Sequence, residues 1–420
     1  MNKNKKSTLL LVVLLSLALL VSLTACVSGG SPSPATSSTP APSSSAGSSA
    51  GSSAAASSQV PVASGEPVKI GLIAAKTGVN QAVGIFSQEG AQYAVDEINA
   101  SGGILGRPVE LVIEDEVDNL QASVNAATKL MERDDLVAII GSPYSQNTLA
   151  IMPQIAEAKV PFITGGSGDA IAAEGNPYVW QPRNHDSVAA GAIAKYAHDT
   201  IGIKNPAILY CTLPTTQAGG FDIRTAYKEK FGIDVPDNMM FGYTEDEKNF
   251  GPIIAQVMAS GADGILSFSN ENPHTLLSLA IADAGCTLPR VASSTVTSSV
   301  VIKNAGKAAD GWIAVADWSP YLGTPAASKF QEGFLAKYGH DTERPIAVSY
   351  DSVHLIRLAC ENAGTVDDLD AINKGFEKIE GYQGVLGDMT YKEDHGFLSA
   401  IFFVEIKDSK ATMIDAVKYR

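Results

Sequence analysis

Short apolar runs alternate along the chain with polar, glycine-containing loops and with segments in which apolar residues recur at helical spacing. The apolar run 136–140 is followed by a loop, by apolar positions at 150, 151, 155 and 156, and by a second run at 160–163. A strand, a helix and a strand in this order predict a βαβ unit with parallel strands. Loops that leave the carboxyl ends of such strands line the ligand crevice, so we expect residues 142–148 and 164–169 to share one rim.

These two loops are rich in hydroxyl and amide side chains and in glycine. A helix is predicted to begin in each loop, which directs unpaired backbone N–H groups and the positive end of a helix dipole toward the crevice. The pattern therefore predicts a binding site for a small anion or a carboxylate.

The same alternation continues through the chain. Further strands are predicted from the mainly apolar stretches 68–73, 109–113, 207–210, 264–268 and 311–315. Alternating strands and helices are typical of the α/β class with parallel sheets. The chain from about residue 68 onward is long enough for two domains.

The N-terminus predicts an export signal over residues 1–25. Lysines precede an apolar segment at 9–23, and small residues then precede Cys26, as in the lipobox of bacterial lipoproteins. A transmembrane helix is the alternative, but the apolar segment is short for a membrane span. We therefore expect Cys26 to carry a lipid that holds the protein at the extracytoplasmic face of the cell membrane.

Residues 26–66 predict a lipid-anchored linker. Between positions 28 and 65 the chain is almost wholly Ser, Ala, Pro and Gly, with no charged or aromatic residue. Such a segment cannot bury a hydrophobic core. The solute-binding domain is accordingly expected to span 67–420.

The net charge and the absence of catalytic motifs exclude several classes of function. The chain has 30 basic and 45 acidic residues, which argues against nucleic acid and anionic lipid as partners. The loop 165–169 lacks the closing glycine of a nucleophile elbow, and the sequence has no phosphate-binding loop and no His-Glu-x-x-His motif. Its six histidines have no metal-ligand spacing. We predict neither an enzyme nor a cofactor or metal site.

Cysteines other than Cys26 stand at positions 211, 286 and 360. An odd number of widely spaced cysteines is no disulfide framework, so buried free thiols are the favoured interpretation. A bridge between Cys211 and Cys286 remains open in an exported protein.

Several motifs together resemble the leucine/isoleucine/valine-binding protein family, the solute receptors of ABC transporters. These motifs are VKIG at 68–71, INASGGILG at 98–106, GSPYSQNT at 141–148, YQGVLG at 382–387 and DHG at 394–396. The resemblance implies a periplasmic-binding protein type I fold, with two Rossmann-like lobes joined by three hinge crossings. The crossings are expected near 183–186, 292–295 and 383–388. Lobe one would hold about 68–184 and 294–382, and lobe two about 185–293 and 383–420.

The resemblance also implies that the two loops of the first lobe hold the ligand's carboxylate. Ser145 and Thr148 match hydroxyl positions of the family, whereas Asn147 and Gly168 stand where relatives often carry Ser or Thr. Gly166 and Ser167 complete the expected contacts, although a plain tight turn is the alternative for this glycine-rich loop.

In the second lobe, Glu271 follows the strand 264–268 and is our candidate for the ligand's ammonium, with Asp317 as runner-up. The alternative for Glu271 is a solvated loop carboxylate. Gln217 replaces the tyrosine of a Tyr-Gly pair common in relatives, which favours a larger or more polar ligand than leucine. Phe86 and Tyr144 are candidates for apolar lining, or are ordinary core residues.

The sequence thus predicts a lipoprotein that captures a small amino acid, of the branched-chain type or related, and delivers it to ABC transporter permease subunits. Two alternatives stay open. One is a sensor of the same fold that signals to a membrane receptor, and the other is a receptor for a non-amino-acid carboxylate or amide.

Overall fold

The computed structural model describes residues 62–78, 81–117, 119–397 and 400–417. Chain contacts assign all of them to one unit, Ser58–Arg420. The predicted export signal, Cys26 and nearly all of the predicted linker lie outside the described residues, so these expectations remain predictions.

The first sheet is built from the apolar runs of the N-terminal half. Its order is β2-β1-β3-β4-β5, and every neighbouring pair is parallel. The central strand β3 is buried along its whole length, which explains its unbroken apolar sequence. The strands are β1 (Val68–Ala74), β2 (Val109–Asp115), β3 (Leu136–Ile140), β4 (Phe162–Ile163) and β5 (Val179–Trp180).

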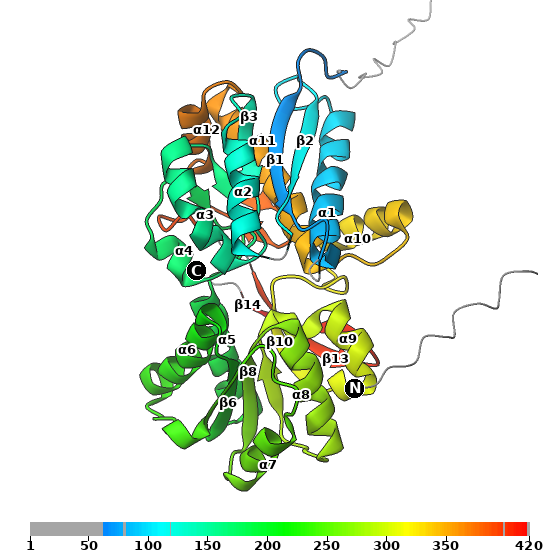
Figure 1. Ribbon diagram of the computed structural model, residues 1–420. Helices are drawn as coiled ribbons and strands as arrows, with labels where there is room; N and C mark the ends of the chain where they lie inside the picture. The colour runs from blue at the N-terminus through cyan, green and yellow to red at the C-terminus, as the bar shows by residue number, and fades with distance from the viewer. Residues whose placement is uncertain (1–61, 79–80, 118, 398–399, 418–420) are drawn as a thin grey trace, which may run out of the picture. The chain divides into compact units, whose positions relative to one another are not determined.

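Helices cover both faces of this sheet (Figure 1). Helices α1 and α11 pack against each other with Gly90 at their contact, because a Cβ on Gly90 would stand 2.1 Å from the carbonyl oxygen of Ile346. The helices of this lobe are α1 (Gln81–Ala100), α2 (Leu120–Met131), α3 (Ser145–Ala158), α4 (Asp169–Ala173), α10 (Pro325–Tyr338), α11 (Arg344–Ala363) and α12 (Leu369–Phe376).

The second sheet has the order β14-β13-β10-β9-β8-β6-β7. Alternate residues of β6 enter different cores: Ala207 and Leu209 pack with residues of α7 and α8, whereas Ile208 and Tyr210 pack with residues of α5 and α6. Its strands are β6 (Pro206–Cys211), β7 (Met240–Tyr243), β8 (Gly264–Phe268), β9 (Arg290–Ala292), β10 (Trp312–Ala316), β13 (Ile401–Lys407) and β14 (Lys410–Val417).

The remaining elements of the chain are helical or form a short hairpin. The longer helices are α5 (Asp186–Tyr196), α6 (Pro214–Phe231), α7 (Gly251–Ala259), α8 (Glu271–Asp283) and α9 (Ser299–Ala305). Single turns are η1 (Ala197–Ile201), η2 (Asp237–Met239), η3 (Ser294–Thr297) and η4 (Gly306–Ala309), and the hairpin consists of β11 (Tyr382–Gln383) and β12 (Asp388–Met389). Among the described helices, none combines the length and the apolar character needed to cross a membrane.

The α/β class and the two sheets are confirmed, but the second sheet is mixed rather than parallel. Strand β13 runs antiparallel to both β10 and β14. The turn between β13 and β14 uses Asp408 and Ser409 at φ 49° and 61°, so two residues other than glycine adopt the left-handed conformation of a tight hairpin. Without a glycine at this turn, the hairpin had no strong sequence signal.

The sheet pairing also corrects two of the expected crossings. Strand β9 pairs with both β8 and β10, so the chain remains in the second sheet through Ala316 instead of leaving it near 292–295. Residues 383–388 lie beside α11 of the first lobe, and the chain enters the second sheet only at β13. The expected lobe ranges 294–382 and 383–420 are therefore wrong at these boundaries.

The hairpin at 382–389 is held by a fully buried carboxyl group on α11. Asp351 accepts hydrogen bonds from the backbone N–H of Val385 at 3.1 Å and of Leu386 at 2.8 Å, and from the Tyr382 hydroxyl at 3.2 Å. Burial raises the pKa of Asp351 to about 7, against the hydrogen bonds that favour the carboxylate. A protonated carboxyl group is thus favoured in the folded state at acidic pH.

We predict that Asp351 makes stability fall as the pH rises. Its folded-state pKa lies above that of an unfolded aspartate, so its contribution is fully present below the unfolded pKa and is lost as the pH approaches 7. Relative to Asp351→Asn, the wild-type free energy of unfolding should decrease by about 1.4 kcal/mol per pH unit over this window. Urea denaturation between pH 5 and 8 measures this, and identical pH slopes in the two proteins would contradict it.

Candidate functional site

A cavity of about 1110 Å³ lies at the carboxyl ends of strands from both sheets. The first turns of α3, α5, α6, α8 and α11 all contribute lining residues, among them Ser145, Asp186, Thr215, Glu271 and Arg344. Helix N-termini carry unpaired N–H groups and partial positive charge, so their convergence favours anionic groups in this cavity.

The N-terminus of α3 offers donors that the described chain does not use. Its N-cap, Tyr144, makes no side-chain capping bond, and the first backbone bond of the turn runs from Thr148 N–H to Tyr144 C=O at 3.1 Å. The backbone N–H groups of Ser145, Gln146 and Asn147 therefore have no backbone acceptor among the described residues. They give this edge of the cavity the donors that favour an anionic group.

The glycine-rich loop after β4 lies against this edge. Ser145 Oγ accepts a hydrogen bond from Gly168 N–H at 3.0 Å, and Ser167 Oγ accepts one from Arg183 Nη1 at 3.0 Å. The side chains of Ser145 and Ser167 are nearly buried, yet both line the cavity. Arg183 Nη1 also donates to the Gly165 carbonyl oxygen at 3.1 Å, so this arginine fixes the loop from behind.

Arg183 forms a buried ion pair with Asp317. Its Nε donates to Asp317 Oδ2, and the two side chains are only 10% and 8% exposed. Burial by itself would raise the pKa of Asp317, but the nearby guanidinium groups of Arg183 and Arg344 outweigh it and lower that pKa. Oδ2 of Asp317, the runner-up for the ammonium site, is thus engaged by an arginine, whereas its Oδ1 has no hydrogen-bond partner among the described residues, and its role toward an ammonium stays a prediction.

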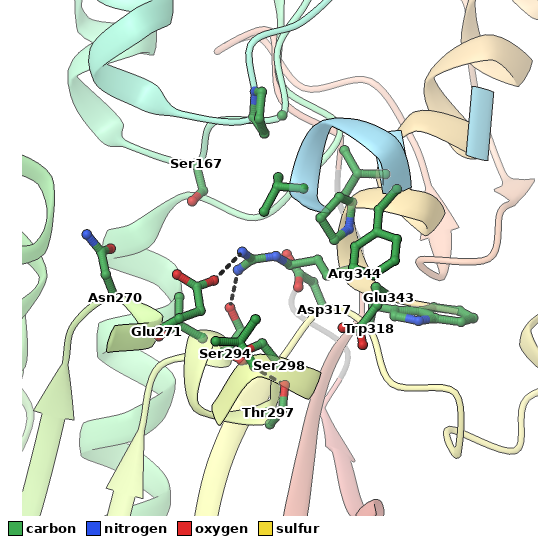
Figure 2. Close-up of a pocket in the computed structure, with 18 of the residues that line it drawn as sticks. Ser167, Asn270, Glu271, Ser294, Thr297, Ser298, Asp317, Trp318, Glu343 and Arg344 are labelled. Carbon is green, nitrogen blue, oxygen red and sulfur yellow. Dashed lines mark hydrogen bonds and ion pairs between the residues drawn. The ribbon is translucent and has the colours of Figure 1, made fainter. Parts of the chain in front are cut away.

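Glu271 faces the cavity from the first turn of α8. Arg344, the first residue of α11, reaches toward it: Arg344 Nη2 lies 3.6 Å from Glu271 Oε1, and Nη1 donates to Ser294 Oγ at 2.9 Å. Figure 2 shows the Arg344 guanidinium between these two partners, with Ser167 on the other side of the cavity. Glu271 of the second lobe and Arg344 of the first lobe therefore lie close together in the same pocket.

The expected site residues divide into two groups. Those that line the cavity are Phe86, Tyr144, Ser145, Asn147, Ser167, Glu271 and Asp317. Those that are not among its lining residues are Thr148, Gly166, Gly168 and Gln217. Contact of the first group with a ligand stays a prediction.

The second group has other partners or positions. Thr148 is fully buried with its Oγ1 2.7 Å from Thr164 Oγ1, so its hydroxyl has a partner within the first lobe, and its contact with a ligand stays a prediction. The backbone N–H of Gly166 donates to Thr164 Oγ1 at 2.9 Å, and that of Gly168 donates to Ser145. Gln217 stands in the first turn of α6, directly after the lining residues Thr215 and Thr216, but is not itself part of the lining.

Sequence reasoning missed a buried acid beneath α3. Glu116 is 1% exposed, and its Oε2 accepts hydrogen bonds from Asn147 Nδ2 at 3.1 Å and from Ser123 Oγ at 3.0 Å. Burial raises the pKa of Glu116. The Asn147 amide is thereby held under the helix turn, and the only available signal was that Glu116 directly follows a strand.

Two further features of the cavity were also missed. One is a set of hydroxyl side chains after β9, including Ser294, Thr297 and Ser298, whose signal was the Ser/Thr-rich run at 293–299. The other is Arg344, whose signal was an arginine directly before a proline at a helix start.

The three cysteines outside the N-terminal region, Cys211, Cys286 and Cys360, are buried free thiols, so the bridge left open between Cys211 and Cys286 is not formed. Within the part of the chain that the structure describes, no group of His, Cys, Asp or Glu side chains is arranged to hold a metal ion.

We predict that breaking the Arg183–Asp317 pair strongly destabilises the fold. Arg183→Met should lower the free energy of unfolding by about 3–5 kcal/mol, because it leaves Asp317 charged, buried and unpaired. The control is Arg357→Met, which breaks a more exposed pair with Glu361 on α11 and should cost about 0.5 kcal/mol. Equal losses for the two variants in urea denaturation would show that the Arg183 pair is not critical.

The chain matches the family model described as periplasmic binding protein over residues 67–411. An amino acid binding protein of Pseudomonas aeruginosa is 26% identical over 311 residues, which cover 72% of this chain and 81% of the relative. Leu/Ile/Val-binding protein homolog 3 of Brucella melitensis is 24% identical over 337 residues, covering 80% of this chain and 90% of the relative.

Solved structures share the fold. The leucine binding protein LivK of Thermotoga maritima gives a TM-score of 0.76 at 23% identity, covering 84% of this chain and 99% of that one. LivJ of Streptococcus pneumoniae, in complex with isoleucine, gives 0.75 at 22% identity, covering 84% and 100%. A solute binding protein of Rhodopseudomonas palustris, in complex with p-hydroxybenzoic acid, gives 0.75 at 21% identity, covering 84% and 97%.

The family model spans most of the chain, and these neighbours reproduce the arrangement of its two sheets. As the resemblance to Leu/Ile/Val-binding proteins predicted, this chain belongs to the periplasmic binding protein family and has the type I fold of its solute-binding proteins.

Proposed function

We propose that this protein is the extracytoplasmic substrate-binding lipoprotein of an ABC importer and that it captures a small amino acid or a related carboxylate in the cavity between its lobes. In this proposal Cys26 carries the lipid, residues 26–66 tether the domain to the membrane, and permease subunits receive the ligand. Closure of the two lobes about the hinge would enclose the ligand.

The observation that carries the proposal is the opposed chemistry of the cavity walls. One wall presents the unpaired N–H groups at the start of α3 with the Ser145 and Ser167 hydroxyls, and the other presents the Glu271 carboxylate. A free amino acid carries a carboxylate and an ammonium on one carbon atom, so it suits walls of opposite character. Phe86 and Tyr144 add aromatic surface to the cavity lining.

The relatives support the same class of ligand. They include a protein named for amino acid binding and a solved structure with isoleucine bound. A receptor for a non-amino-acid carboxylate is the second candidate, favoured by Arg344 inside the cavity and by the neighbour that holds p-hydroxybenzoic acid. A sensor that signals to a membrane receptor would use the same cavity, and docking to permease subunits would distinguish transport from signalling.

We predict that Ser145→Ala and Glu271→Gln each weaken amino-acid binding, by about 1–3 kcal/mol. The first removes a hydroxyl that lines the carboxylate wall and anchors Gly168 N–H, and the second removes the charge that faces the ligand's ammonium. Calorimetric titration of the purified protein with a binding amino acid measures the loss.

Glu229→Gln is the matched control, because Glu229 is an exposed acid on α6 outside the cavity lining. If both cavity variants bind as tightly as the Glu229 variant, the proposed site is wrong. If only Glu271→Gln is neutral, the second candidate, a carboxylate without an ammonium group, is favoured.

A further inference from the structure

Arg344 is a cation inside the cavity with unused hydrogen-bonding capacity. A guanidinium has five N–H donors. Among the described residues, Arg344 has one hydrogen bond, to Ser294 Oγ at 2.9 Å, and one ion pair, to Glu271 at 3.6 Å. The latter separation exceeds a normal N–H···O hydrogen bond, so the pair is a loose one. The side chain is 26% exposed, and it lines the cavity.

Arg183 also lines the cavity, but it is held more tightly. It is 10% exposed and donates to Asp317, the Gly165 carbonyl oxygen and Ser167 Oγ. These three hydrogen bonds position the loop after β4. Arg344, with one hydrogen bond and 26% exposure, has more donors left for a ligand.

The surroundings of Arg344 include polar side chains as well as the ring of Trp318 (Figure 2). Ser294, Thr297, Ser298 and Glu343 line the same part of the cavity (Figure 2). Burial raises the pKa of Glu343, which disfavours the charged form of this neighbouring acid. An aliphatic ligand side chain placed here would desolvate the guanidinium and offer it no acceptor, which disfavours binding.

An acidic amino acid would meet an opposite partner with each of its charges. Its ammonium replaces Arg344 as the partner of Glu271, and its side-chain carboxylate replaces Glu271 as the partner of Arg344. Its α-carboxylate takes the N–H groups at the start of α3. Arginine matches the planar, two-oxygen geometry of a carboxylate better than lysine does.

We propose that Arg344 determines ligand specificity by binding a carboxylate on the ligand side chain, so that this receptor prefers acidic amino acids to aliphatic ones. This inference rests on the proposed function and names the substrate class of the same site.

The test is calorimetric titration of the purified full chain with L-glutamate, L-aspartate, L-glutamine and L-leucine, for the wild type and for Arg344→Gln, Arg344→Lys and Arg357→Gln. In the wild type we expect one of the two acidic amino acids to bind about tenfold or more tighter than leucine and glutamine. Arg344→Gln should remove that preference and leave leucine affinity within about threefold.

Two controls separate specificity from structural damage. Arg357 lies on the same helix, outside the cavity lining, and its replacement should leave all affinities unchanged. Arg344→Lys keeps the charge but loses the two-pronged geometry, so it should restore part of the preference for the acid, and it keeps the proposal testable if Arg344→Gln does not fold.

Leucine binding tighter than both acids would overturn this inference and leave the proposed function in place, as would equal weakening of acid and leucine by Arg344→Gln. Equal affinity for glutamine and glutamate would also overturn it, because the charge of the ligand's side chain would then not affect binding. Absence of binding by any amino acid would instead overturn the amino-acid form of the proposed function.

Discussion

The buried ion pair between Arg183 and Asp317 is the interaction on which the rest of the cavity depends. Arg183 stands where the chain leaves the first sheet after β5, and Asp317 stands directly after β10 of the second sheet. A buried charge is tolerated only when it is paired and hydrogen-bonded, so the pair fixes these two chain segments relative to each other. The same guanidinium holds Gly165 and Ser167, which places the anion-binding loop.

The polar groups of the cavity therefore have two different roles. Arg183, at the cavity wall, positions the glycine-rich loop, and Glu116, outside the cavity lining, positions Asn147 in the first turn of α3. Ser145, Ser167, Glu271 and Arg344 face the cavity itself. Because the donors of α3 oppose an acid that is only loosely paired, the cavity walls differ in charge, as the proposed amino-acid ligand requires.

The sequence was sufficient to predict the strands, the helices and the loops at the edge of the cavity. It was not sufficient to predict which residues far apart in the chain contact each other. Runs such as 136–140 and 264–268 became strands at the expected positions, since burial on both sheet faces favours a largely apolar sequence, with Ser267 as the polar exception. The predicted crossing near 292–295 was wrong because β9 pairs with β10, and pairing between separate strands cannot be seen in the local sequence. Arg344 lies 73 positions from Glu271 in the chain, so the sequence around it did not indicate that the two residues pair. Thr148 fitted the hydroxyl pattern, but its distance from the cavity depends on the packing of Thr164.

The most direct measurement is a thermal-shift screen of the domain beginning near Glu66 against the standard amino acids, aromatic acids, short amides and polyamines. A ligand that binds only the folded state raises the melting temperature by mass action, whatever its binding site. We predict a rise with at least one amino acid and none with polyamines, which lack the carboxylate that the α3 wall requires. A rise with polyamines alone, or no rise with any compound, would contradict a carboxylate-binding cavity.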